Sequence, residues 1–121
     1  MSVTYTTAAI VKKRVKSISS SLSDDDIEEN ILQAESLIDS VMKRTARGTS
    51  PDFTFDADKH GIIRDCATNY AAYLCITYDP TEFASMETAE MVANLLWNAV
   101  QNALTMLSDS RFVEYLASLS P

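Results

Sequence analysis

At two places in the chain, acidic residues are spaced so that their carboxylates could bind a metal ion. Asp56 and Asp58 come shortly before Gly61, as oxygen ligands precede a glycine in a calcium-binding loop. The twelfth position of such a loop needs a glutamate, and here it is Ala67. The start of a helix explains the two aspartates more simply than a calcium site does.

Glu87 and Glu90 form the second place, because two residues three positions apart lie on one face of a helix. All-α nucleotide pyrophosphohydrolases hold magnesium with such a pair and a second acidic pair on another helix. Glu35 and Asp39 are the nearest second pair, at a different spacing. An exposed first helical turn also favours carboxylates, through the helix dipole. A small all-α nucleotide pyrophosphohydrolase is therefore an alternative function, not the favoured one.

Other residue types that bind metals or act as nucleophiles are few. His60 is the only histidine, which excludes zinc sites built from several histidines, and we expect it on the surface or at a helix end. Cys66 and Cys75 would lie about 13 Å apart along one helix and on opposite faces, so they cannot form a disulfide. We therefore expect reduced thiols, no bound metal or cofactor, and no catalytic residues.

The net charge of −7 is unevenly distributed. Residues 1–22 carry four basic residues and no acidic one, whereas residues 23–42 carry seven acidic residues and no basic one. The basic residues are Lys12, Lys13, Arg14 and Lys16. A helical nucleic-acid-binding regulator is a further alternative, but no aromatic residue is interleaved for base stacking. The acidic total disfavours duplex DNA and anionic membranes, so we favour a solvated helix face or a patch that meets an acidic neighbour.

Residues 91–108 carry no charge, although polar side chains interrupt the stretch. These are Asn94, Asn98, Gln101, Asn102 and Thr105. They would lie on the side of a helix opposite its apolar side. Amides can pair across an interface where an unpaired charge would be costly, so we expect a subunit interface that contains Asn94, Asn98, Gln101 and Asn102. The same side chains disfavour a membrane span.

Composition and periodicity predict an all-α fold, a small helical bundle of four main helices plus a short C-terminal helix. Two glycines and three prolines are too few for the many turns of a β-sandwich or barrel. We expect helices from Thr6 or Thr7 to about Lys16, from Ser23 to about Arg47, from Asp56 or Asp58 to about Tyr78, from between Pro80 and Thr88 to about Leu107, and from Ser110 to about Leu119. Residues 49–56 are expected to form a loop.

Two of these helices have a predicted buried side. Ser23 can cap the helix that follows it, ahead of three aspartates, and its apolar residues recur at spacings of three and four: Ile27, Ile31, Ala34, Ile38 and Val41. The expected core face of the fourth helix consists of Met91 or Val92, Leu95, Leu96, Ala99, Val100, Ala103, Met106 and Leu107.

The chain divides into a helical domain, residues 1–109, and a C-terminal segment, residues 110–121. The segment carries an apolar face made of Phe112, Tyr115, Leu116 and Leu119. A helix this short is marginal by itself, so the segment must dock either on this domain or on a partner.

The order of these elements resembles that of the head-to-tail connector, or adaptor, proteins of tailed bacteriophages and related viruses. The likeness covers about residues 4–78. It rests on patterned helices at residues 5–7 (YTT), 22–27 (LSDDDI), 34–39 (AESLID) and 62–68 (IIRDCAT).

The resemblance implies a structural virion protein and not an enzyme. Such subunits form a dodecameric ring beneath the portal protein, continue the DNA channel without sequence-specific binding, and dock the next neck or tail-completion protein. The implied location is the virion neck, after assembly in the host cytoplasm and without a membrane. Because the C-terminal segment of such proteins reaches the portal, Phe112, Tyr115 and Leu116 are the candidate portal interface.

Overall fold

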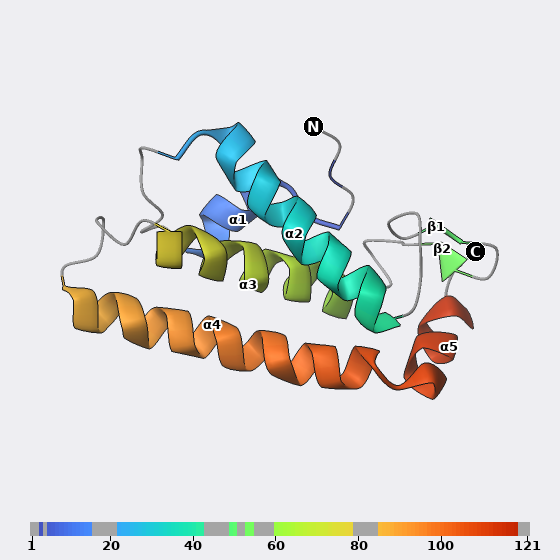
Figure 1. Cartoon of the computed structure of the whole chain (residues 1–121). Helices are drawn as coiled ribbons and strands as arrows, with labels where there is room; N and C mark the ends of the chain where they lie inside the picture. Colours follow the sequence, from blue (N-terminus) through green and yellow to red (C-terminus); the bar gives the residue numbers. More distant parts are fainter. Residues whose placement is uncertain are drawn as a thin grey trace.

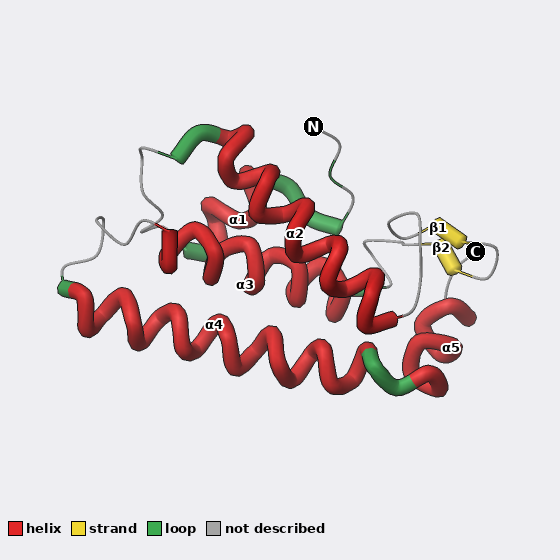
Figure 2. Tube along the Cα trace, viewed as in Figure 1, coloured by secondary structure: helices red, strands yellow, loops and turns green. Residues whose placement is uncertain are grey.

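A computed structural model describes residues 3, 5–15, 22–42, 49–50, 53–54, 60–78 and 85–118. These residues form five helices and one short hairpin: α1 (Ala8–Arg14), α2 (Asp24–Met42), β1 (Thr49–Ser50), β2 (Phe53–Thr54), α3 (Gly61–Tyr78), α4 (Met86–Leu107) and α5 (Ser110–Ser118) (Figure 1). The predicted fold class, a small all-α bundle, is confirmed. Figure 2 shows how little of the described chain is not helical.

Helix α3 lies at the centre of the bundle, with α2 and α4 on either side of it (Figure 1). Helix α1 packs against both α2 and α3. The expectation of a loop over residues 49–56 is wrong for residues 49–50 and 53–54, because strands β1 and β2 pair antiparallel there, with Thr49 opposite Thr54. None of the described helices has the length and apolar content that crossing a membrane requires.

Helix α2 begins as the sequence predicts. The Ser23 hydroxyl accepts a hydrogen bond from the Asp26 amide (3.2 Å), and the Asp26 carboxylate accepts one from the Ser23 amide (3.0 Å). This reciprocal pair satisfies two amides that a helix start would leave free. The predicted seam is buried from Ile27 to Ile38, while Val41 is half-buried. The expected end near Arg47 lies outside the described residues.

Helix α3 begins later than expected, at Gly61 instead of Asp56 or Asp58. The carbonyl of His60 accepts hydrogen bonds from the Ile63 and Arg64 amides (3.0 and 3.4 Å), so His60 is the last residue before the helix. Its imidazole is fully buried, with Nε2 2.7 Å from the carbonyl oxygen of Leu116. Of the two positions expected for His60, the surface or a helix end, the structure confirms the helix end. The side chain is buried because its partner Leu116 lies 56 residues further along the chain.

Two clusters of buried side chains form the core. The first joins α1 and the N-terminal half of α2 to the C-terminal half of α3 and the start of α4, and its members include Val11, Ile27, Ile31, Ile76 and Leu96. The second joins the other ends of these helices to α5, and its members include Tyr5, Ile38, Ile63, Leu107 and Leu116. The core therefore runs the full length of the bundle and includes α5.

Tyr5 connects the segment before α1 to α2 and α3 through hydrogen bonds. Its amide donates to Glu35 Oε2 (2.7 Å), its hydroxyl donates to Asp39, and its carbonyl accepts from Arg64 Nε (2.9 Å). Burial, the hydrogen bond to Asp39 and the charges of both carboxylates raise the pKa of the Tyr5 hydroxyl far above its usual range. Tyr5 thereby provides hydrogen-bond donors to two carboxylates that lie inside the protein.

Helix α5 belongs to the same packed body as the rest of the chain. Val113 and Leu116 are buried in the second cluster, and Phe112 packs against that cluster. The expected division between residues 109 and 110 is therefore only the turn between α4 and α5, and the core continues across it. Of the two docking possibilities left open for this segment, the structure shows docking on its own domain. The side chain of Leu119 lies outside the described residues.

We expect Ile38→Asp to unfold the protein, because it places a carboxylate at a position with no exposure to water. The loss of unfolding free energy should exceed about 4 kcal/mol. Gln33→Asp on the exposed side of the same helix is the matched control and should change stability by less than about 0.5 kcal/mol. Thermal melting followed by circular dichroism measures both, and equal melting temperatures would contradict the placement of Ile38.

We also expect the protein to lose stability in alkaline solution through its buried thiols. Burial raises the pKa of the Cys66 thiol from 9.0 to about 12. Above pH 9.0 the unfolded chain therefore releases a proton that the folded protein keeps. The contribution of the protonated Cys66 thiol to the free energy of unfolding is complete below pH 9.0. It is lost as pH rises towards 12, by about 1.4 kcal/mol per pH unit for one thiol.

Urea unfolding on both sides of this pH range tests the assignment. The Cys66→Ala variant is less stable at neutral pH because it loses core volume, but its further loss in alkali should be smaller than that of the unmodified protein. The same alkaline loss in both proteins would show that Cys66 is not the group responsible.

Candidate interaction surface

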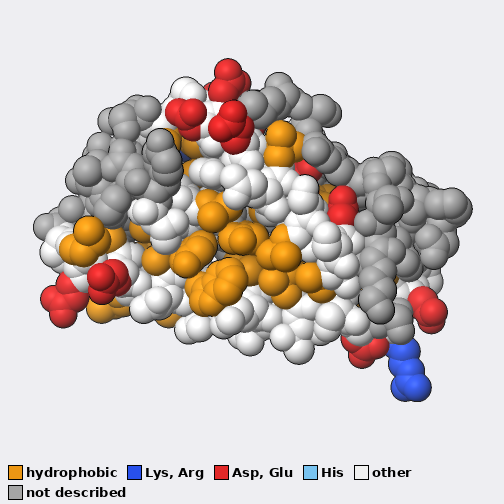
Figure 3. Space-filling model, in the orientation of Figure 1, with side chains coloured by type: hydrophobic (Ala, Val, Ile, Leu, Met, Phe, Trp, Pro, Cys, Tyr) orange, Lys and Arg blue, Asp and Glu red, His pale blue; other side chains and the backbone are white. Residues whose placement is uncertain are grey.

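The exposed side of α4 carries no charge from Met91 to Ser108. The amides and the threonine that the sequence singled out, Asn94, Asn98, Gln101, Asn102 and Thr105, are all exposed. The buried side of the helix consists of Ala89, Ala93, Leu96, Val100 and Leu107. Figure 3 shows the result: acidic side chains at one end of α4, charged side chains at the other, and none on the visible surface between them.

The predicted core face of α4 is wrong in three of its members, because Leu95 and Met106 are 65% and 47% exposed and Ala99 is exposed as well. Of the two alternatives Met91 and Val92, Met91 is 61% exposed, whereas Val92 packs against the first core cluster. The seam that runs through Leu96 already covers the side of α4 that faces α3, and Leu95 is turned by about 100° from Leu96. The apolar residues of α4 therefore lie on two sides of the helix, and only one of these sides faces the core.

We call this exposed surface the α4 outer face, and its members are Met91, Asn94, Leu95, Asn98, Ala99, Gln101, Asn102, Thr105 and Met106. It combines long apolar side chains with amides and lacks charge. Depletion of charge together with enrichment of methionine is typical of the central part of a protein–protein interface. The apolar members were missed as site residues. The sequence feature that could have revealed them is the number of apolar residues in α4, which exceeds what a single buried stripe at spacings of three and four accounts for.

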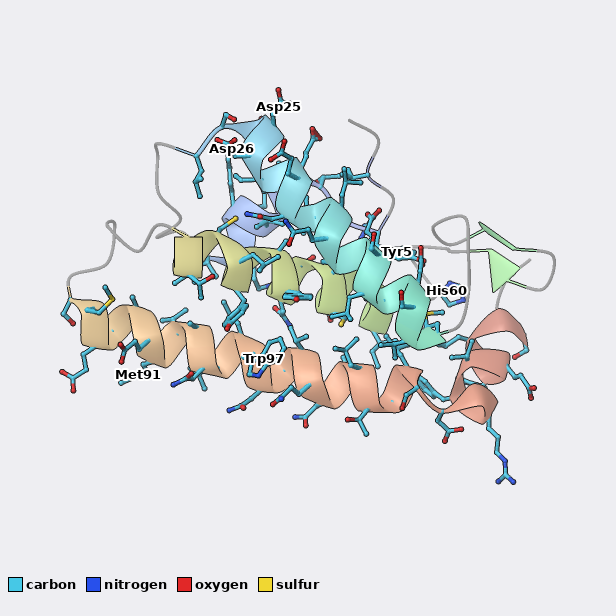
Figure 4. All side chains as sticks on the ribbon, in the orientation of Figure 1. Tyr5, Asp25, Asp26, His60, Met91 and Trp97 are labelled. Atoms are coloured by element: carbon cyan, nitrogen blue, oxygen red, sulfur yellow. The ribbon has the colours of Figure 1, made fainter. Side chains whose placement is uncertain are left out.

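Three aromatic rings hold the neighbouring side of α4 against α3. The indole of Trp97 stacks on the ring of Tyr73 (centroids 5.2 Å apart) and meets the ring of Tyr70 edge-on (5.8 Å). Figure 3 shows a hydrophobic patch over α3 and α4 on this side of the molecule, in the region where Figure 4 labels Trp97. Such contacts restrict rotation of α4 about its axis, which gives the α4 outer face a defined orientation.

The C-terminal candidates are only partly available to a partner. Leu116 lies in the core, and Phe112 is half-buried against it. Tyr115 is 58% exposed, and its ring stacks on that of Phe112 (6.3 Å). The expectation that Leu116 offers a portal-binding side chain is therefore corrected, because that side chain fills its own domain. A role for Tyr115 stays a prediction.

The four carboxylates of the alternative hydrolase site do not come together. Glu87 and Glu90 are exposed near the start of α4, which packs with the first core cluster. Glu35 and Asp39 are buried next to Tyr5, which belongs to the second cluster. Among the residues that the structure describes, no three His, Cys, Asp or Glu side chains are grouped to hold a metal ion.

The basic residues of α1 meet acidic neighbours within the chain. Lys12 pairs with Asp24 at the start of α2. Arg14 pairs with Asp65 of α3 (3.0 Å) and also donates to the side chain of Asn69 (2.7 Å). Two of the four cations proposed for nucleic-acid contacts are thus engaged in contacts with α2 and α3.

An apolar groove lies between the end of α3 and the start of α4. Its lining consists of Ile76, Thr77, Met86, Ala89, Glu90 and Ala93, and its volume is about 190 Å³. Pockets for small organic ligands generally start at about 300 Å³. The groove is smaller than that, so the α4 outer face is the stronger candidate for function.

Comparison of the chain with family models, with curated protein sequences and with solved structures finds no match. The resemblance to connector proteins consequently rests on the patterned helices alone, and the α4 outer face is the feature of the described residues that bears on function.

We expect the same substitution at two adjacent leucines of α4 to have very different effects on stability. Leu95→Asn should change the free energy of unfolding by less than about 0.5 kcal/mol, because Leu95 is exposed. Leu96→Asn should cost about 2–5 kcal/mol, because it places an amide in the first core cluster. Urea unfolding at low protein concentration measures both, and equal losses would contradict the orientation of α4.

Proposed function

We propose that this protein is a structural adaptor of a viral neck. In this function, copies of the chain form a ring beneath the portal, extend the DNA channel, and provide a docking face for the next neck or tail component. The observation that carries the proposal is the α4 outer face, an exposed and uncharged helix surface in a chain whose net charge is −7.

Self-association explains this surface better than solvation does. Methionine and leucine on a water-facing side of a helix contribute little to the stability of the fold. Large exposed apolar patches are also uncommon in monomeric proteins. Contact between copies of an acidic protein is also hindered by repulsion, unless the contact surfaces carry no carboxylates. The α4 outer face meets this condition along about four helical turns.

The acidic surface supports a role beside DNA. Asp25, Asp26 and Glu29 are exposed on α2. Carboxylates repel the phosphates of a duplex, so DNA could pass an acidic wall without adhering to it. A channel component needs this property, whereas a protein that binds DNA needs the opposite one.

Neither alternative function receives comparable support. The hydrolase needs Glu87 and Glu90 close to a second acidic pair, and Glu35 and Asp39 are instead buried with Tyr5. The nucleic-acid-binding regulator needs free cations on α1, and Lys12 and Arg14 are paired with acidic residues.

We expect the full chain to co-sediment with portal rings of its own virus and to form a ring on them that is visible by electron microscopy. Tyr115→Ala should weaken this binding about tenfold, as expected for an exposed aromatic side chain that anchors an interface. Glu114→Ala, one residue away and also exposed, is the matched control.

Two outcomes would contradict different parts of this proposal. If the unmodified chain stays in the supernatant and remains monomeric at every concentration, the adaptor function is wrong. If Tyr115→Ala binds portal rings as well as the unmodified chain, the adaptor function stands and Tyr115 is not the anchor.

A further inference from the structure

Helix α2 has an unusual distribution of charge in its second half. The acidic residues of this half, Glu35 and Asp39, face the interior. The exposed residues are Gln33, Ser36 and Ser40, and Leu37 beside them is half-buried. We call these four residues the α2 outer strip. The strip is uncharged, although the first half of the same helix exposes Asp25, Asp26 and Glu29.

Burial of the two carboxylates requires compensation. A carboxylate without partners inside a protein costs several kcal/mol. Tyr5 reduces this cost by donating its amide hydrogen to Glu35 (2.7 Å) and its hydroxyl hydrogen to Asp39. This arrangement removes both charges from the outside of α2, where water would have solvated them freely.

The α2 outer strip and the α4 outer face lie on opposite sides of the bundle. Helix α3 stands between the two helices and packs against both of them (Figure 1), and the two surfaces consist of residues on the exposed sides of α2 and α4. Two different surfaces on opposite sides of one subunit allow each copy to contact two neighbours head to tail. Repetition of such a contact gives a ring when the rotation between copies closes.

The two surfaces also complement each other in the size and polarity of their side chains. The α4 outer face carries the long side chains of Met91 and Leu95, whereas the strip offers the small side chains of Ser36 and Ser40. The Ser40 hydroxyl donates to the Ser36 carbonyl (2.9 Å), so its hydrogen is already bonded when water is excluded. The amide of Gln33 can pair with amides of α4, and no carboxylate of either surface has to be desolvated.

We propose that the α4 outer face of one copy packs against the α2 outer strip of the next copy, around the whole ring. This inference rests on the proposed adaptor function, since it identifies the two surfaces through which ring subunits meet. In a twofold contact between two α4 outer faces, the long side chains of one copy would face the long side chains of the other. Such a contact would also leave the α2 outer strip uncovered.

Cross-linking between copies tests the pairing. Ser36→Cys and Leu95→Cys each add one exposed thiol to the full chain. The native thiols give little background, because Cys66 and Cys75 are buried and burial raises the pKa of both. The two variants are mixed, at high concentration and on portal rings, and are treated with a short bismaleimide.

The expected product is a covalent dimer that contains one copy of each variant. Each variant alone should remain monomeric after treatment. A mixture of Leu95→Cys with Glu29→Cys is the matched control, since Glu29 is exposed on the acidic half of α2, and it should give little dimer. Unchanged melting temperatures of the three variants establish that each one is folded.

The remaining outcomes separate this inference from the function on which it rests. Dimers formed by Leu95→Cys alone would show a twofold contact and overturn the inference. Absence of mixed dimers, while the chain still forms rings on portal, would also overturn it but leave the adaptor function in place. Absence of both cross-linking and portal binding would overturn both proposals.

Discussion

The burial of α3 between α2 and α4 is the constraint on which the rest of the structure depends. Close approach of helices on two sides requires small residues, and Ala67, Ala71 and Ala72 of α3 are all fully buried. Since α2 and α4 each bury one side against α3, their other sides face outwards in different directions. The packing of α3 therefore determines that the α2 outer strip and the α4 outer face point away from each other.

Tyr5 links the interior of the protein to the chemistry of its surface. The α2 outer strip is uncharged because Glu35 and Asp39 point inwards, and they can do so because Tyr5 supplies hydrogen bonds to both. The Tyr5 carbonyl in turn accepts from Arg64 of α3. Tyr5, a single residue in the segment before α1, thus holds that segment in place. It also determines which side chains α2 presents to its surroundings.

Features determined by neighbouring residues could be predicted from the sequence, and features determined by distant partners could not. The start of α2 depends on Ser23 and Asp26, three positions apart, and it was predicted correctly. The burial of His60 depends on Leu116, and that of Glu35 on Tyr5, so no local pattern indicates either. For the candidate site, the amides of α4 were expected on an exposed side, whereas Leu95 was misassigned because helical spacing alone does not show which of two apolar sides meets the core.

The proposed contacts of the adaptor use separate parts of the molecule and can form together. Neighbours in a ring would occupy the sides of the bundle, at the α2 outer strip and the α4 outer face. Tyr115 lies on α5, beyond the C-terminal end of α4 (Figure 1). The buried side chain of Val113 and the contact between Leu116 and His60 fix α5 to the core. Because α5 shares the second core cluster with the helices that form the sides, binding of α5 to a portal ring would orient both side surfaces equally in every copy. Docking on the portal would then lower the entropic cost of closing the ring.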